Sequence, residues 1–235
     1  MRHLNFLPCV LLAACTSFAT ALPAAEVPPM PQTIHYLALG DSYTIGESVR
    51  ADERWPNQLA TLLEAAPGLG NLDMEVTFVA RTGWTTDELW EGIQAQPIEP
   101  PYDLVSLLIG VNNQYRGRDL NEYREQFTFL LNKAVEYAGG NADKVIVLSI
   151  PDWGVTPFAA DRDRNQITKA IDAFNAVNKA ETEKAGAHYV DITPVSRTAT
   201  SDPALIAEDG LHPSGKMYAE WAQLALPVML EILKR

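Results

Sequence analysis

The chain has 235 residues, of which 47% are hydrophobic and 20% charged. This composition supplies enough apolar material for a sizeable core and argues against extensive disorder. There are 18 lysines and arginines against 30 aspartates and glutamates, and the formal net charge at pH 7 is −12. Phosphate polyanions repel such a chain, so nucleic acid is excluded as a partner and an anionic membrane surface is disfavoured.

The N-terminus has the pattern of an export signal. Met1-Arg2-His3 precedes an apolar stretch, 4–19, that is too short and too interrupted to span a membrane. Ala19-Thr20-Ala21 fits ordinary cleavage after residue 21, whereas Leu12-Ala13-Ala14-Cys15 resembles a bacterial lipobox, in which Cys15 becomes lipidated. Either site predicts export: the protein would be periplasmic, secreted or lipid-anchored to the envelope. Both cysteines of the chain lie in this region, so no disulfide framework is available.

A linker and one domain follow the signal. Residues 22–32 are rich in proline and alanine, a composition that favours an extended tether. No internal repeat is visible, and residues 33–235 are long enough for one α/β unit. The sequence therefore predicts a signal at 1–21, a linker at 22–32 and a single domain at 33–235; it predicts no oligomeric state.

Five short runs rich in Val, Ile and Leu alternate with amphipathic segments. Buried runs of this kind predict a parallel sheet covered on both faces by helices, an α/β three-layer sandwich. The flavodoxin-like strand order 2-1-3-4-5 is the expected one. The expected strands are 34–39, 74–80, 104–109, 144–150 and 188–192.

The intervening helices have readable ends. Thr85 and Glu88, three residues apart, predict a capping box, and Ser214 is a favoured N-cap residue. Pro227 predicts a kink in the last helix. The helices are expected to run from Pro56 to before Pro67, from Thr85 onward, from Asp119 to before Gly139, from Asp161 to Ala185 and from Ser214 to Leu233.

Four motifs stand at the carboxyl ends of these strands or ahead of a helix. They read Gly40-Asp41-Ser42, Arg81-Thr82-Gly83-Trp84, Ile109-Gly110-Val111-Asn112 and Asp209-Gly210-Leu211-His212-Pro213. Binding crevices of open α/β sheets form at that edge, so residues far apart in sequence are expected to converge on one crevice.

From about residue 33 to the C-terminus the chain resembles the SGNH (GDSL-type) hydrolase family in motif order. The residues that give the family its name match Ser42, Gly83, Asn112 and His212, and Asp209 precedes the histidine by three. One departure shows, since the family's usual Gly-x-Asn-Asp ends here in Asn113. The resemblance implies a serine esterase, and the departure puts any role of the following carboxylate in doubt.

A serine needs a base to attack an acyl carbon, and the chain has four histidines to supply one. His3 belongs to the signal, and His35 and His188 open strands at the opposite edge of the sheet, so these three are interpreted as structural. His212 is the expected base, with Asp209 orienting its ring. Asp41 is expected only to hold its loop by accepting backbone N–H groups.

Charge that develops on the substrate oxygen needs fixed donors. The expected donors are the backbone N–H groups of Ser42 and Gly83 and the side-chain amide of Asn112. A glycine allows close approach of its N–H, and an asparagine donates without carrying charge. No cofactor is implied, and the sequence shows none of the common metal-ligand spacings.

Aromatic residues in the loops after the strands are the candidate substrate contacts: Tyr43, Trp84, Tyr115 and Trp153. They could line an acyl pocket or stack on a sugar ring. The favoured interpretation is an exported esterase acting on carboxylic or thioesters of short to medium acyl chains. A carbohydrate O-deacetylase of the same family and a non-catalytic envelope binding protein on the same fold stay open as alternatives.

Overall fold

The computed structural model describes residues 30–234. In this part of the chain five parallel strands form one sheet in the order β2-β1-β3-β4-β5, as the sequence predicts. The predicted signal, both of its processing sites including Cys15, and most of the predicted linker lie outside the described residues. The strands are β1 (Gln32–Gly40), β2 (Leu72–Ala80), β3 (Leu104–Leu108), β4 (Val145–Leu148) and β5 (His188–Val190).

The strand boundaries differ from the expected ones in a consistent way. β1 and β2 each begin two residues early, because they pair with each other from Gln32 and Leu72 onward, whereas β3 joins β1 only at Tyr36. The two strands thus project beyond the rest of the sheet. β4 and β5 are shorter than expected, since the residues after Leu148 and Val190 leave the sheet for the loops at its carboxyl edge.

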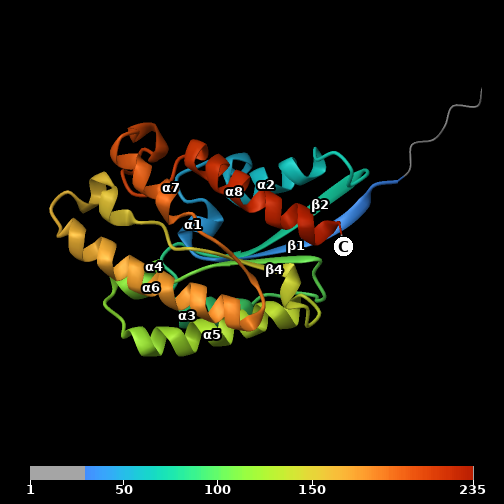
Figure 1. Cartoon of the computed structure of the whole chain (residues 1–235), viewed down its shortest axis with the longest axis horizontal. Coiled ribbons are helices and arrows are strands. Elements are labelled where there is room, and N and C mark those ends of the chain that lie inside the picture. Colours follow the sequence, from blue (N-terminus) through green and yellow to red (C-terminus); the bar gives the residue numbers. More distant parts are fainter. Residues whose placement is uncertain (1–29, 235) are drawn as a thin grey trace, which may run out of the picture.

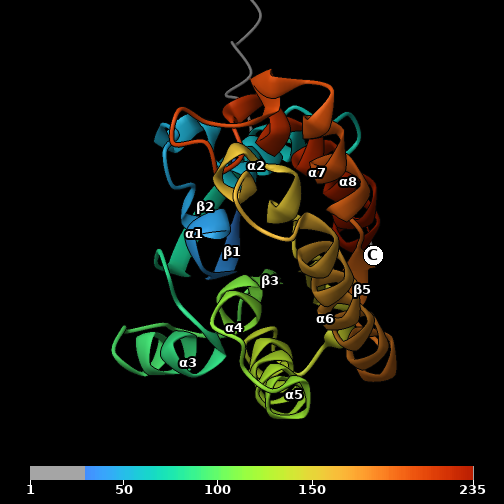
Figure 2. The same ribbon diagram turned by 90° about the vertical axis from the view of Figure 1, so that its left-hand side faces the viewer.

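Helices cover both faces of the sheet, with α2 and α8 on one side and α3, α5 and α6 on the other (Figures 1 and 2). The α-helices are α1 (Ser42–Ile45), α2 (Trp55–Glu64), α3 (Thr86–Gln94), α4 (Val111–Tyr115), α5 (Leu120–Tyr137), α6 (Arg164–Ala185), α7 (Thr193–Arg197) and α8 (Gly215–Leu233). Single 3-10 turns lie at Ala51–Glu53, Ala142–Lys144, Trp153–Val155, Pro157–Ala159, Thr198–Thr200 and Pro203–Leu205.

α3, α5 and α8 begin where their capping residues predict, whereas α6 begins at Arg164, later than the expected Asp161, because Asp163 is its N-cap. Thr85 and Glu88 form the expected capping box at the start of α3, and the Asp119 carboxylate accepts the N–H groups of Asn121 and Glu122 ahead of α5. The first turn of a helix leaves N–H groups unpaired, and these side chains satisfy them. The Ser214 hydroxyl caps α8 in the same way, and that helix continues through Pro227 to Leu233.

The core lies between the sheet and its two helical layers. Trp55 of α2 and Trp221 of α8 are fully buried, and these two helices pack against each other. No helix among residues 30–234 is long and apolar enough to cross a membrane.

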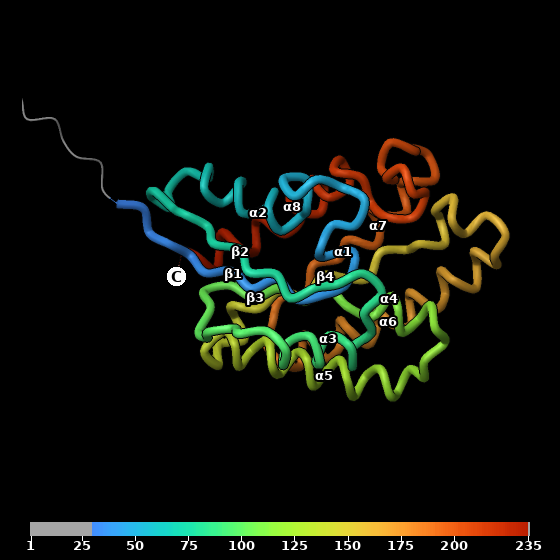
Figure 3. The backbone as a smooth tube through the Cα atoms, turned by 180° about the vertical axis from the view of Figure 1, so that it is seen from behind, coloured from blue at the N-terminus to red at the C-terminus, as the bar shows by residue number. Residues whose placement is uncertain are grey.

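Two short helices stand where the sequence predicted turns or loops. α1 follows β1 directly and α4 follows β3, and both lie at the carboxyl edge of the sheet together with α7 (Figure 3). Ser42 is the first residue of α1, and Asn112 lies in the first turn of α4. Ser42 and Asn112 are therefore carried by the first turns of helices, whereas Gly83 and His212 lie in loops.

Candidate active site

Ser42 is held at the end of β1 by a tight capped turn. Asp41 is the N-cap of α1, and one of its carboxylate oxygens accepts the backbone N–H of Tyr43 at 3.0 Å, which is the loop-holding role expected for it. Gly46 ends the helix in the left-handed conformation, with φ of 69°. Burial raises the pKa of Asp41 to about 7, although its hydrogen bond from Tyr43 acts in the opposite direction. Its second oxygen is buried without a hydrogen-bond partner among the described residues.

His212 is buried and is fixed by the carboxylate of Asp209. Its Nδ1 lies 2.5 Å from Asp209 Oδ2, and Asp209 Oδ1 accepts the backbone N–H groups of Leu211 and His212 at 2.9 Å each. Partial burial alone would raise the pKa of Asp209, but hydrogen bonds from His212, Ser48 and these backbone groups hold it well below its usual range. An ionised carboxylate only accepts, so Nδ1 carries the proton, and Nε2 of the neutral ring is left free to take one.

Gly83 occupies a backbone conformation with φ of 88°, which favours glycine. Its carbonyl accepts Arg116 Nη2 at 2.6 Å, and the same guanidinium contacts Glu88 Oε1 through Nη1 at 3.0 Å. The pKa of Glu88 is lowered chiefly by that hydrogen bond from Arg116. The capping glutamate of α3 and an arginine after α4 thus hold the carbonyl of Gly83, the residue whose own N–H group is the expected donor.

Asn112 and Asn113 have separate tasks. Asn112 Nδ2 donates to the carbonyl of Trp84 at 2.9 Å, which fixes the amide and leaves its second N–H free. The buried Asn113 accepts the backbone N–H of Thr86 at 3.1 Å and donates to the Thr86 hydroxyl at 2.7 Å. A carboxylate could not make the second of these bonds. Asn113, where the family usually has an acid, therefore joins α4 to the start of α3.

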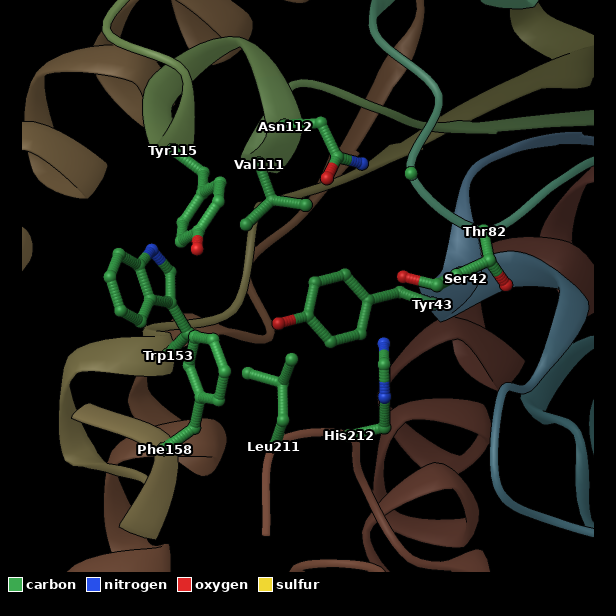
Figure 4. A pocket seen from close by; sticks show the side chains of 11 residues that line it. Ser42, Tyr43, Thr82, Val111, Asn112, Tyr115, Trp153, Phe158, Leu211 and His212 are labelled. Atoms are coloured by element: carbon green, nitrogen blue, oxygen red, sulfur yellow. The ribbon is translucent and has the colours of Figure 1, made fainter. Parts of the chain in front are cut away.

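A cavity of about 190 Å³ brings these elements together. In Figure 4, Ser42 and His212 lie on one side of it, with the outer ring nitrogen of His212 toward Ser42, and an aromatic group lies on the opposite side. The lining is mostly apolar, which suits an acyl group. It comprises Ser42, Tyr43, Thr82, Gly83, Val111, Asn112, Tyr115, Trp153, Phe158, Leu211 and His212.

The far side of the cavity is formed by the rings of Tyr115, Trp153 and Phe158, which we call the aromatic wall. Their centroids lie 5.4 to 6.3 Å apart. The Arg162 guanidinium carbon lies 5.2 to 5.5 Å from all three centroids, a cation–π arrangement. Trp153 Nε1 also donates to Gln114 Oε1 at 2.8 Å. The guanidinium of Arg162, which also donates to the Tyr115 hydroxyl at 3.2 Å, therefore braces the wall.

Trp84 lies elsewhere than the sequence predicted. It does not line the cavity of Ser42, and its indole ring packs so closely on Gly92 of α3 that a Cβ atom there would lie 2.0 Å from the ring. The backbone of Trp84 is at the site, through its carbonyl, while its side chain points to a neighbouring hollow that also includes Glu88 and Arg116. The other three predicted aromatic contacts, Tyr43, Tyr115 and Trp153, do line the cavity.

The remaining described histidines lie away from the cavity. His35 on β1 faces Glu75 of β2 at 3.2 Å, and His188 at the start of β5 contacts Asp143 at 2.9 Å. Among residues 30–234 there is also no group of three or more His, Cys, Asp or Glu side chains placed to hold a metal ion. His212 is thus the described histidine placed to act on Ser42.

Several residues of the site were not singled out from the sequence, among them Phe158 and Arg162 of the aromatic wall and its brace. Val111 and Leu211 line the cavity, and each directly precedes a candidate residue, Asn112 or His212. Their position next to these residues in the sequence was the signal that could have identified them. Arg116 and Ser48 act through side-chain hydrogen bonds to Gly83 and Asp209, and nothing in their sequence surroundings marks those partners. The two contacts join segments 33 and 161 residues apart.

Comparison with known proteins agrees with this geometry. Residues 38–220 match the GDSL-like lipase/acylhydrolase family. No curated protein matches the chain. The fold is similar to that of a lipolytic protein of the G-D-S-L family from Veillonella parvula, with a TM-score of 0.62 and 19% identity over 84% of this chain and 98% of that one.

Two solved esterases share the fold at similarly low sequence identity. The psychrotrophic esterase EstA from Pseudoalteromonas sp. has a TM-score of 0.64 and 17% identity, covering 86% of this chain and 99% of that one. The acetylxylan esterase Axe2 from Geobacillus stearothermophilus has a TM-score of 0.61 and 20% identity, covering 86% and 94%. At such identities the likeness concerns the fold alone.

A three-layer fold with a serine and a carboxylate-bound histidine at the sheet's carboxyl edge is the arrangement of a serine hydrolase. Because the family match spans most of the chain, this protein belongs to the GDSL-like lipase/acylhydrolase family and is a serine ester hydrolase.

Proposed function

We propose that the protein hydrolyses carboxylic or thioesters of short to medium acyl chains through an acyl intermediate on Ser42. The observation that carries the proposal is the shared cavity of Ser42 and His212, in which Asp209 occupies Nδ1 of the ring and leaves Nε2 for the serine. The apolar lining and the aromatic wall supply a surface for the acyl chain.

In the proposed mechanism Ser42 Oγ attacks the acyl carbon while His212 Nε2 takes its proton. The negative charge on the former carbonyl oxygen is met by the N–H groups of Ser42 and Gly83 and by the free N–H of Asn112. His212 then protonates the leaving alcohol or thiol. A water molecule, activated by the same ring, releases the acid and restores Ser42. No cofactor takes part.

The test is hydrolysis of p-nitrophenyl esters of increasing acyl length by the purified protein, with Ser42→Ala as the control. We expect Ser42-dependent turnover that falls beyond a certain chain length, because the aromatic wall ends the cavity. Loss of turnover in Ser42→Ala should be complete within detection. Turnover that survives in Ser42→Ala would contradict the assignment of the nucleophile.

The second candidate is a carbohydrate O-deacetylase. A larger and more polar hollow of about 540 Å³ lies across the aromatic wall and shares Tyr115 and Trp153 with the cavity of Ser42. A sugar ring could stack on these rings while its acetyl group reached Ser42. Acetylated xylo-oligosaccharides tested beside the p-nitrophenyl esters separate the two functions. Failure of both substrate classes would favour the binding-protein alternative.

We also propose that the protein is exported, either cleaved after residue 21 or lipidated on Cys15 and anchored to the envelope. The support is the sequence pattern of the first residues. The mass of the mature N-terminus tests it. A free N-terminus at residue 22 supports ordinary cleavage, and a Cys15 carrying acyl chains, absent in Cys15→Ser, supports the anchor.

A further inference from the structure

Ser48 is an exposed residue with an unusual backbone. Its φ is 65°, and no other non-glycine residue among 30–234 has a positive φ. A side chain with a Cβ atom is disfavoured in this region, and an exposed serine gains little packing in return. Strain of this kind is retained where the surroundings or the function require that particular side chain.

The Ser48 hydroxyl donates to Oδ2 of Asp209 at 2.7 Å. That is the same oxygen that lies 2.5 Å from Nδ1 of His212. Oδ1 is occupied by two backbone N–H groups of its own loop, so Ser48 supplies the contact to Asp209 from another segment of the chain. The hydrogen bond from Ser48 also contributes to the lowered pKa of Asp209.

The segment that carries Ser48 begins at the end of α1, directly after the helix of Ser42. The Glu47 N–H donates to the Ser42 carbonyl at 3.0 Å, and the Glu47 carboxylate accepts the hydroxyl of Thr82, the residue before Gly83. Two adjacent side chains therefore link the nucleophile's helix to the other two loops of the site. Glu47 reaches the loop of Gly83, and Ser48 reaches the loop of His212.

We propose that Ser48 is a positioning residue for the reaction: its hydroxyl holds the carboxylate of Asp209 so that the ring of His212 stays aligned with Ser42. The proposal rests on the proposed function of Ser42 and His212. Ser48 does not touch the substrate. It acts through Asp209, and its φ of 65° is the conformation in which its hydroxyl reaches that carboxylate.

Three variants separate positioning from stability. Ser48→Gly removes the hydroxyl but relieves the backbone strain, since glycine adopts positive φ freely. Ser48→Thr keeps the hydroxyl but places a β-branched residue at a strained position. Ser201→Gly is the matched control, because Ser201 is also exposed and its hydroxyl bonds only the nearby Thr198 carbonyl.

We expect Ser48→Gly to be at least as heat-stable as the unmodified protein. Its kcat on p-nitrophenyl butyrate should fall about three- to tenfold with little change in KM. A loss of this size is expected for one exposed hydrogen bond to a charged acceptor. Ser48→Thr should be less heat-stable and yet retain more of the kcat than Ser48→Gly. Unchanged kcat in Ser48→Gly, or activity that simply follows thermal stability across the series, would overturn the proposal.

A second readout does not depend on turnover. The Nδ1–H proton of a histidine bonded to a carboxylate resonates far downfield in proton NMR, and we expect this signal of His212 to move in Ser48→Gly and to stay in Ser201→Gly. An unmoved signal would overturn the role of Ser48 even in an active enzyme. If the unmodified protein cleaved no ester, a moved signal would still support the link between Ser48 and Asp209, and the failure would belong to the proposed substrate.

Discussion

The two sides of the cavity are built on different physical principles. On the polar side, three residues are held by hydrogen bonds to groups outside the cavity: His212 by Asp209, Asn112 by the Trp84 carbonyl, and Gly83 by Arg116, which bonds its carbonyl. On the other side, the aromatic wall is held by ring packing and by the cation–π contact of Arg162. Directional bonds fix atoms at single positions, whereas contact between apolar groups has no such directional requirement.

This difference suggests that reactivity and specificity are set separately. Changes on the polar side should slow the reaction on every ester by similar factors. Changes in the aromatic wall should alter the ranking of esters. The following predictions test that separation, from the largest expected effect to the smallest.

The largest effect is expected at Asn112. Asn112→Ala removes one of the three donors that we propose for the substrate oxygen, and kcat should fall about a hundred- to a thousandfold. The fall should be similar for acetate, butyrate and octanoate esters, because the lost contact is to the common oxygen. The measurement is steady-state kinetics, with the exposed Asn121→Ala in α5 as control. A fall confined to one chain length would contradict the separation.

A smaller effect is expected at Arg116. Arg116→Met removes the hydrogen bond to the Gly83 carbonyl, and kcat should fall about tenfold or less, since the arginine acts through the peptide rather than on the substrate. Arg118→Met is the matched control: Arg118 is equally exposed and its ion pairs are with Asp87 and Glu122. Equal losses in the two variants would show that general surface charge, rather than the Gly83 contact, matters.

In the aromatic wall the expected change is one of ranking. Trp153→Leu shortens the wall, so the ratio of octanoate to butyrate turnover should rise a few-fold while butyrate turnover changes little. Phe158→Leu, at a more exposed position, should act in the same direction with less risk to folding. Trp84→Leu is the control, because its ring lies against Gly92 outside the cavity. If Trp84→Leu altered the ratio as strongly, the wall would not be the specificity element.

The smallest effect concerns stability and comes from Asp41. Burial raises its pKa from 3.8 to about 7, so between these values the folded chain holds a proton that the unfolded chain has lost. Folding stability from this group therefore falls as pH rises from about 4 to 7. Asp41→Asn keeps the capping oxygen and does not titrate. The melting temperature of Asp41→Asn minus that of the unmodified protein should be larger at pH 8 than at pH 5. An equal difference at the two pH values would contradict the raised pKa of Asp41.

The strands, the long helices and the main motif positions could be predicted because each depends on local sequence, and the sheet order followed from the fold class that this alternation of strands and helices indicates. Apolar strands, the capping box at Thr85 and the N-cap at Ser214 are local signals, and the sheet's carboxyl edge then collects Ser42, Gly83, Asn112 and His212. The direction of the Trp84 ring could not be predicted in this way. It depends on the space left by Gly92, eight residues further on, in a helix whose placement the sequence does not specify.

The same limit explains why the supporting residues were missed. Arg116, Ser48 and Arg162 are exposed charged or polar residues, a type that is mostly solvated, and each gains its role from a partner brought near by the fold. Tertiary contacts of this kind leave no periodic pattern in the sequence. The positive φ of Ser48 is visible only in the backbone.

The contact made by Asn113 also bears on how the site responds to acid. Its amide bonds Thr86, whose hydroxyl in turn contacts the amide of Gln126, so α3, α4 and α5 meet through three uncharged groups. None of the three gains or loses a proton in the range where proteins stay folded. An acid at position 113 would make this junction titrate. With asparagine there, this junction beside Asn112 keeps the same hydrogen bonds in acidic and neutral surroundings.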